Sequence, residues 1–181
     1  IERDIKNIYV NNENDYKSIK EYIESINSSD NVNVILKKDM DLLDKYQIRK
    51  QIEKSNKRKV WLNCGGFITI DKTEALTAID VNSGKYIGNK NLEETVLKVN
   101  REATKEIAKQ IRLRDIGGII VIDYIDMKEK SSKEEIKNLL EERLKEDRSK
   151  TQIMDFTKLN LLELTRKHIF SNNYEKKEEM E

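Results

Sequence analysis

Proline is absent from this 181-residue sequence, and cysteine occurs only once, at Cys64. A single cysteine excludes a disulfide within the chain and any zinc site built from several of its cysteines. Runs of about 18 or more apolar residues are also missing, so the sequence predicts no membrane span. The lack of proline, with abundant Lys, Asn, Ile and Glu, is typical of codon bias in an AT-rich genome and indicates no function.

An excess of one charge is lacking as well, because 35 Lys and Arg residues nearly balance 34 Asp and Glu residues. Net charge therefore indicates no polyanionic partner, and any contact with nucleic acid has to come from a local patch. The apolar residues, 36% of the chain, occur in periodic runs, so we expect a folded protein. No signal-peptide pattern follows the first residue, and we expect a cytoplasmic location.

The sequence does contain strand and helix patterns that predict an α/β fold, with a mixed sheet flanked by helices. A basic turn near residues 54–59 suggests two domains, residues 1–56 and residues 57–181. The second domain begins with three strand patterns that predict an antiparallel meander. They cover residues 60–62, 66–71 and 75–81.

Further periodicity predicts helices and buried strands. Helices are expected at residues 42–55, 93–114 and 159–170, and one more runs to residue 147 with Ser131 or Ser132 as its cap. Residues 119–122 form a continuous β-branched run, which predicts a strand buried on both faces. Residues 152–156 predict another strand.

Two of the predicted strands end in acidic residues. Asp80 and Asn82 are two residues apart in one strand, so their side chains share a face. Asp123 ends the strand after the long helix and reaches the same edge if the two strands are neighbours. Two carboxylates and an amide oxygen would form the hard, incomplete oxygen shell that Mg²⁺ prefers. Such an ion can orient a phosphodiester and activate water.

Spacing alone leaves another interpretation open, because aspartates at strand ends also turn the chain or cap the next helix. A P-loop is excluded, since Ser83, Gly84 and Lys85 lack the upstream glycine and are followed by Tyr86. A phospho-acceptor receiver domain needs five strands in a parallel order, and the predicted meander argues against it.

Two long segments resemble the catalytic signature of the ribonuclease E/G family. They are residues 73–83 (TEALTAIDVNS) and 113–127 (LRDIGGIIVIDYIDM), and the resemblance extends over nearly the whole chain. It implies that residues 57–181 form a DNase I-like catalytic subdomain. Residues 1–56 would be the C-terminal part of a ribonuclease H-like subdomain with a structural role.

The resemblance also implies an activity: magnesium-dependent endonucleolytic cleavage of single-stranded RNA to 5′-phosphate and 3′-hydroxyl products, in rRNA processing and RNA decay. Asp80 and Asp123 match the aspartates that bind the catalytic Mg²⁺, for which Mn²⁺ can substitute. Asn82 matches the asparagine that supports this site. The alternative is that this stretch by itself is a non-catalytic RNA-binding or assembly module.

Family members contain an S1 domain, a 5′-end sensor and a zinc-link that joins two protomers. We expect zinc and the homo-oligomer only in the parent protein, through a zinc-link outside this chain. Candidate RNA phosphate contacts are basic residues, although charged residues more often cover a solvated face. They are Lys72, Arg112, Arg114, Arg148 and Lys150, the last of which matches a basic residue that faces the RNA 5′ end in the family.

Five other residues have a structural and a functional interpretation. Asp126 is expected in a turn or as an outer-shell metal ligand. Trp61 and Tyr124 can stack on bases, although core or rim positions are more frequent. The single histidine, His168, is expected on the last helix, where it packs or faces water. Cys64 has no partner for nucleophilic catalysis and is expected to be incidental.

Overall fold

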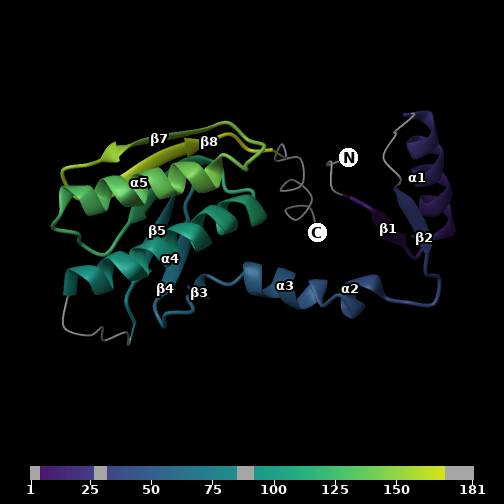
Figure 1. The fold of residues 1–181 in the computed structure, drawn as a ribbon, viewed down its shortest axis with the longest axis horizontal. Coiled ribbons are helices and arrows are strands. Elements are labelled where there is room, and N and C mark those ends of the chain that lie inside the picture. Colours follow the sequence, from purple (N-terminus) through teal and green to yellow (C-terminus); the bar gives the residue numbers. More distant parts are fainter. Residues whose placement is uncertain (1–4, 27–31, 85–91, 170–181) are drawn as a thin grey trace. The chain divides into compact units, whose positions relative to one another are not determined.

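A computed structural model describes residues 5–26, 32–84 and 92–169 of the chain. The chain divides into two compact units, Ile1–Glu53 and Lys54–Glu181 (Figure 1). Each unit has its own sheet. The assignment of the two units to named subdomains stays a prediction.

The first unit contains a two-stranded parallel sheet and mainly exposed helices. β1 (Asn7–Val10) and β2 (Asn33–Leu36) pair in parallel, and α1 (Glu13–Ser25) lies between them in the sequence. The helix begins after Asn12, whose side-chain oxygen accepts a hydrogen bond from the backbone N–H of Asn14 at 2.7 Å. Among the described residues of this unit, Val10 is the only buried hydrophobic residue, so its core is very small.

The single helix predicted for residues 42–55 is wrong. The segment forms two shorter helices, α2 (Leu42–Lys45) and α3 (Ile48–Ser55). Gln47 separates them with a φ of 55°, a left-handed conformation that interrupts a right-handed helix. Helical periodicity continues through this residue, so the pattern of apolar residues did not reveal the break.

The second unit is a mixed α/β structure, which confirms the predicted fold class at that level. Its sheet has the strand order β3-β4-β5-β6-β8-β7. The strands are β3 (Lys59–Trp61), β4 (Phe67–Lys72), β5 (Leu76–Asn82), β6 (Gly118–Asp123), β7 (Thr151–Phe156) and β8 (Leu161–Arg166). The predicted antiparallel meander of β3, β4 and β5 is confirmed, and β5 and β6 form the parallel pair.

Two long helices cover one face of this sheet. α4 (Leu92–Leu113) and α5 (Lys130–Leu144) lie side by side on the same face (Figure 1). Alternate strand residues, such as Ile79 and Ile122, point into the core beneath the helices and are almost fully buried. None of the helices in the described ranges is long and apolar enough to cross a membrane.

The opposite side of the sheet, called here the open face, is not covered by α4 or α5, the two described helices of the second unit. The prediction that residues 119–122 are buried on both faces is therefore wrong. Ile120 and Ile122 are fully buried under the helices, whereas Ile119 is 51% exposed on the open face. Every second residue of each strand lies on the open face. These residues include Trp61, Phe67, Asp80, Asn82, Ile119, Asp123 and Glu163.

Two further predictions in this unit are wrong. The last predicted helix, at residues 159–170, is instead the strand β8, because Leu162 and Leu164 alternate into the core beside β6; residue 170 lies outside the described residues. The cap of α5 is Glu129, so Ser131 and Ser132 lie within the helix. The strand predicted at residues 152–156 is confirmed as β7.

Candidate active site

The two strand-end aspartates are direct neighbours. Asp80 in β5 and Asp123 in β6 are register partners in the parallel pair, and both are exposed on the open face. Adjacent strands lie about 4.8 Å apart, so the two side chains rise next to each other from the sheet. The structure therefore brings together the acidic pair that the sequence placed at one sheet edge.

Asn82 supports this pair from the same strand. Its side-chain amide donates a hydrogen bond to Asp80 Oδ2, with 2.5 Å between nitrogen and oxygen. Because residues two apart in a strand share a face, this contact follows directly from the Asp-Val-Asn spacing. The bond holds one oxygen of Asp80 in place while the carboxylate remains exposed.

Electrostatic repulsion is built into the pair. Partial burial raises the pKa of Asp123, and the nearby charges of Asp80 and Asp126 raise it further. A cation between the carboxylates would relieve this repulsion. Within the described residues, no group of three or more His, Cys, Asp or Glu side chains is placed to hold a metal ion. Asp80 and Asp123 are the two carboxylates that could hold a cation here, and Mg²⁺ can bind through one or two protein carboxylates because it keeps several waters.

The loop after β6 is held by a buried asparagine that sequence analysis missed. Asn100 on α4 is fully buried, and its amide donates to the Ile125 carbonyl at 2.8 Å. Its side-chain oxygen accepts from the Ile125 N–H at 3.2 Å. The available signal was a polar residue in line with the apolar stripe of α4, between Val96 and Ile107. Through this loop, α4 fixes the chain just beyond Asp123.

A second contact fixes the start of α5 after the same loop. The Glu93 carboxylate, in the first turn of α4, accepts hydrogen bonds from the backbone N–H groups of Lys128 and Glu129 at 3.1 and 3.3 Å. Glu129 is the cap residue of α5 but makes no side-chain capping bond of its own. Glu93 therefore supplies the capping carboxylate from another helix.

Asp126 lies in this loop, in agreement with the turn interpretation. Its carboxylate accepts a hydrogen bond from Asn160 at 3.2 Å, and the Asn160 oxygen accepts one from Lys133 at 2.5 Å. Asn160 occupies the turn between β7 and β8 with a φ of 63°. These contacts tie two loops to α5 near the acidic pair, and whether Asp126 also assists a metal stays a prediction.

Known proteins of one family match this chain in sequence. The sequence model of the Ribonuclease E/G family matches residues 1–169. The chain belongs to the ribonuclease E/G family. It is 44% identical over 126 residues to Ribonuclease G of Salmonella typhimurium (strain SL1344), which covers 70% of this chain and 26% of that protein.

Ribonuclease E of Buchnera aphidicola subsp. Schizaphis graminum (strain Sg) is 40% identical over 174 residues, which cover 95% of this chain and 18% of that protein. Ribonuclease E of Haemophilus influenzae (strain ATCC 51907 / DSM 11121 / KW20 / Rd) is 39% identical over 171 residues. The chain thus spans between 18% and 26% of the length of these relatives. The predicted family membership is confirmed.

The predicted basic contacts do not lie beside the acidic pair of this ribonuclease E/G chain. Lys72 pairs with Thr77 at the start of β5, away from Asp80. Arg112 donates to the Arg143 carbonyl and Glu146, and Arg114 donates to Gln110 and the Lys57 carbonyl. These contacts hold the turn after α4 in place.

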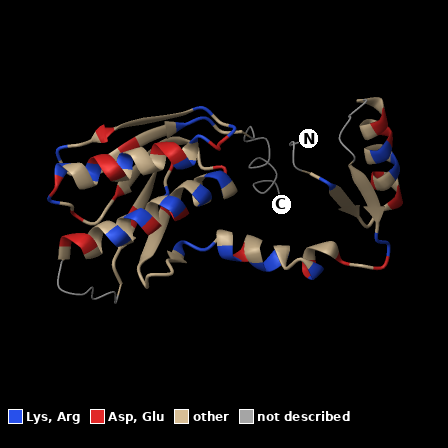
Figure 2. Cartoon of the chain, in the orientation of Figure 1, with Lys and Arg blue, Asp and Glu red and all other residues tan. Residues whose placement is uncertain are grey.

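The other two basic candidates, Arg148 and Lys150, are exposed in the turn before β7. That turn lies at the end of the sheet opposite to Asp123, because Thr151 pairs with Arg166 and Arg166 with Gly118, the first residue of β6. Basic and acidic residues both occur along α4 and α5 (Figure 2). A role in RNA binding for all five basic residues stays a prediction.

The remaining candidates differ in burial. Tyr124 is 3% exposed and contacts Thr104 through its hydroxyl at 3.0 Å, so it is a core residue; burial raises its pKa. His168 lies beyond β8 rather than on a helix, and its Nδ1 is 3.0 Å from the Asp115 carbonyl. Burial raises the pKa of the Cys64 thiol, which disfavours a thiolate nucleophile. Trp61, in contrast, is 64% exposed.

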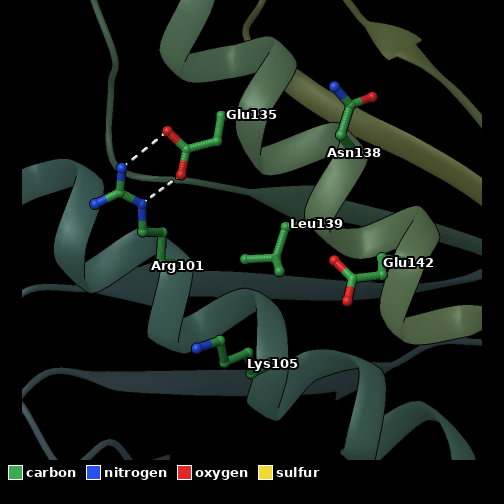
Figure 3. A pocket seen from close by; sticks show the side chains of 6 residues that line it. All are labelled: Arg101, Lys105, Glu135, Asn138, Leu139 and Glu142. Atoms are coloured by element: carbon green, nitrogen blue, oxygen red, sulfur yellow. Dashed lines mark hydrogen bonds and ion pairs between the residues drawn. The ribbon is translucent and has the colours of Figure 1, made fainter.

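A surface pocket of about 300 Å³ lies between α4 and α5, away from the open face (Figure 3). The Arg101 guanidinium and the Glu135 carboxylate form a two-pronged ion pair across it. Its other lining residues are Lys105, Asn138, Leu139 and Glu142. No predicted site residue lines this pocket, so it is separate from the candidate active site.

Proposed function

We propose that this chain contributes the catalytic centre of a magnesium-dependent endoribonuclease that hydrolyses single-stranded RNA to 5′-phosphate and 3′-hydroxyl products in RNA processing and decay. The observation that carries the proposal is the register pairing of Asp80 with Asp123 on an exposed sheet face. Membership of the ribonuclease E/G family supports it.

In this proposal Asp80 and Asp123 hold the metal ion, and Asn82 keeps the Asp80 carboxylate oriented. A bound Mg²⁺ supplies charge neutralisation at the phosphodiester and an activated water. The protein's own contribution is to present two carboxylates in one direction. It also exposes them on a face of the second unit that an extended RNA strand can approach, because α4 and α5 cover only the other face.

The same proposal includes the remaining features of the parent protein. Residues 57–181 would be the DNase I-like catalytic subdomain and residues 1–56 part of a ribonuclease H-like subdomain, acting in the cytoplasm. The parent would be a homo-oligomer joined by a zinc-link outside this chain. The proposed boundary lies close to the division of the chain between Glu53 and Lys54.

The decisive experiment measures metal-dependent cleavage of a single-stranded RNA by the unsubstituted chain, called the parent chain from here on, and by its variants Asp80→Asn and Asp123→Asn. We expect each variant to lose about 10³-fold in rate, the equivalent of several kcal/mol of metal-ion catalysis. Glu163→Gln is the matched control, because Glu163 lies on the same face beside β6 but pairs with Val121. Its rate should equal that of the parent.

Two other results are informative. Equal cleavage by the parent and both aspartate variants would overturn the proposal. RNA binding without any cleavage, unchanged by EDTA and by both substitutions, would favour a non-catalytic RNA-binding module instead. The 3′ ends of the cleavage products are tested with poly(A) polymerase, which extends only a 3′-hydroxyl.

A further inference from the structure

An exposed aromatic cluster lies on the open face close to the candidate active site. Trp61 on the edge strand β3 is 64% exposed, and its ring contacts Phe67 edge-on with 5.3 Å between centroids. Lys59 Nζ lies 4.2 Å from the centroid of the Trp61 ring and 3.4 Å from that of Phe67. These three residues, the Trp61 platform, thus combine a largely exposed indole with a cation held against two rings.

Packing within the sheet does not account for this arrangement. A tryptophan that serves the core buries most of its large surface, as Tyr124 does in this unit. Lysine on an edge strand can protect the edge from pairing with other chains, which explains Lys59 but not the exposed ring beside it. An exposed aromatic ring with a cation at its side is instead the combination that binds single-stranded nucleic acid, by base stacking and phosphate contact.

The strand register connects this cluster to the acidic pair. Trp61 pairs with Phe67, and Phe67 pairs with Asn82, so the three side chains form one row across the open face. The next row contains Lys59, Thr69, Asp80 and Asp123. With strands about 4.8 Å apart, Trp61 lies on the order of 10 Å from Asn82. An extended RNA strand whose phosphate is at Asp80 and Asp123 would reach Trp61 within a few nucleotides.

We propose that the Trp61 platform is a stacking subsite for an unpaired base of the RNA strand whose phosphodiester is held at Asp80 and Asp123. The proposal rests on the proposed ribonuclease function and deepens it. The base stacks on the exposed side of the indole, and the Lys59 ammonium contacts the adjoining phosphate. Because every base has a π-face, the subsite selects single-stranded RNA over duplex without choosing a sequence.

Trp61 is the only tryptophan of the chain, so its fluorescence reports this subsite alone. The parent chain is titrated in EDTA with a short oligoadenylate, with an oligomer of equal length whose riboses carry no bases, and with an RNA duplex. We expect strong quenching by oligoadenylate and little by the other two. Quenching of equal strength by the abasic oligomer or by the duplex would overturn the proposal, as would the absence of quenching by any RNA both in EDTA and directly after addition of Mg²⁺.

Affinity is measured separately, from the anisotropy of a dye-labelled oligoadenylate in EDTA. Trp61→Ala should weaken binding about 5- to 150-fold, the range for loss of one stacked base, and Trp61→Phe should restore most of it. Tyr22→Ala is the matched control, since Tyr22 is a 58% exposed aromatic residue in the first unit. Thermal unfolding followed by circular dichroism verifies that each variant folds.

The two proposals fail in distinguishable ways. Equal affinity of Trp61→Ala and the parent overturns the stacking subsite, even where Asp80→Asn still abolishes cleavage. Unchanged cleavage by Asp80→Asn overturns the proposed function, even where base-dependent quenching of Trp61 persists.

Discussion

At the scale of single residues, the candidate active site places two like charges side by side. Asp80 and Asp123 are direct neighbours on adjacent strands, and the pKa of Asp123 is raised by partial burial and by the two nearby carboxylates. Like charges opposite each other destabilise a sheet. The pair is therefore less favourable without a cation than with one, as the proposed metal site implies.

Asp123→Asn should accordingly stabilise the metal-free chain. Removal of one charge relieves the repulsion, and we expect the free energy of unfolding in EDTA to rise by about 0.5 kcal/mol, by analogy with antiparallel cross-strand pairs. Urea denaturation measures the difference. Glu163→Gln, which removes a charge from the same face, should change it much less.

Addition of Mn²⁺ should reverse the order of the two proteins. A ligand at about 100 times its dissociation constant stabilises the folded state by about 2.7 kcal/mol, and we expect this gain for the parent and not for Asp123→Asn. A parent that gains no stability from Mn²⁺, or a variant that is less stable than the parent in EDTA, would contradict the interpretation of the acidic pair as a metal site.

At the scale of elements, the sequence predicted the parts of the site that depend on local periodicity. The position of Asp80 next to Asn82 follows from the two-residue strand period, and the apolar run before Asp123 marked β6 correctly as a strand. The strand β8 was mistaken for a helix because its six residues, Leu161–Arg166, are too few for the two periods to differ clearly. Their conformation is decided by pairing with β6 and β7.

The periodicity of the sequence could not predict contacts between different helices, strands and loops. Asn100 fits the helical stripe of α4 by position, but its partner, the backbone of Ile125, is 25 residues away. The positions of the basic candidates could not be predicted for the same reason, since the sequence shows charge but not which end of a strand it reaches. Arg112 and Arg114 proved to hold a turn in place.

Asn100→Leu tests the importance of the contact between α4 and the loop after β6. The substitution leaves the N–H and the carbonyl of Ile125 buried without partners, each at about 1–3 kcal/mol. We expect a loss of about 3 kcal/mol in the free energy of unfolding, measured by urea denaturation. Lys105→Leu, on the exposed side of the same helix, should change it by less than about 0.5 kcal/mol. Equal stability of Asn100→Leu and the parent would show that the loop is fixed by other contacts.

At the scale of the whole molecule, stability is unevenly distributed. All residues of the hydrophobic core cluster belong to the second unit, from Leu62 to Leu164, whereas Val10 is the only buried hydrophobic residue described in the first. A two-stranded sheet with so little core is marginal by itself. The second unit should therefore set the unfolding temperature of the chain.

Removal of residues 1–53 tests this inference. The shortened chain should melt within about 5 °C of the parent, which corresponds to roughly 1 kcal/mol for a domain of this size. Circular dichroism during heating provides the comparison. A much lower melting temperature would mean that the first unit supplies stabilising contacts that its own small core does not indicate.

A buried network around Arg166 holds the second unit together at the end of the sheet opposite to Asp123. Arg166 on β8 is fully buried in its side chain and donates to Asp147 and Asp115, each at 2.7 Å, and to the Ile116 carbonyl at 2.9 Å. It thereby joins β8 to the turns that follow α4 and α5. Burial opposes the charge of Asp147, but its hydrogen bonds to Arg166 and Ser149 lower its pKa overall.

This network predicts a specific dependence of stability on pH. Because the pKa of Asp147 is lower in the folded state, its contribution is complete above the unfolded value of about 4 and is lost as the pH falls through the folded pKa. Arg166→Met leaves the buried Asp147 carboxylate without its charged partner, although the Ser149 N–H still donates to it, and should cost about 3–5 kcal/mol near neutral pH. Protonation of the Asp147 carboxylate should reduce this loss of stability in acid. The free energies of unfolding of parent and variant should therefore converge as the pH falls.

Urea denaturation of both proteins from neutral pH down to the acid limit of folding measures the convergence. Arg101→Met provides the control, because Arg101 pairs with the exposed Glu135 and should lose less than about 1 kcal/mol. A deficit of Arg166→Met that stays constant with pH would mean that lost packing, rather than the charge of Asp147, accounts for the destabilisation. The predicted pH dependence therefore separates the electrostatic role of Arg166 from its role as a core side chain, which the substitution alone cannot do.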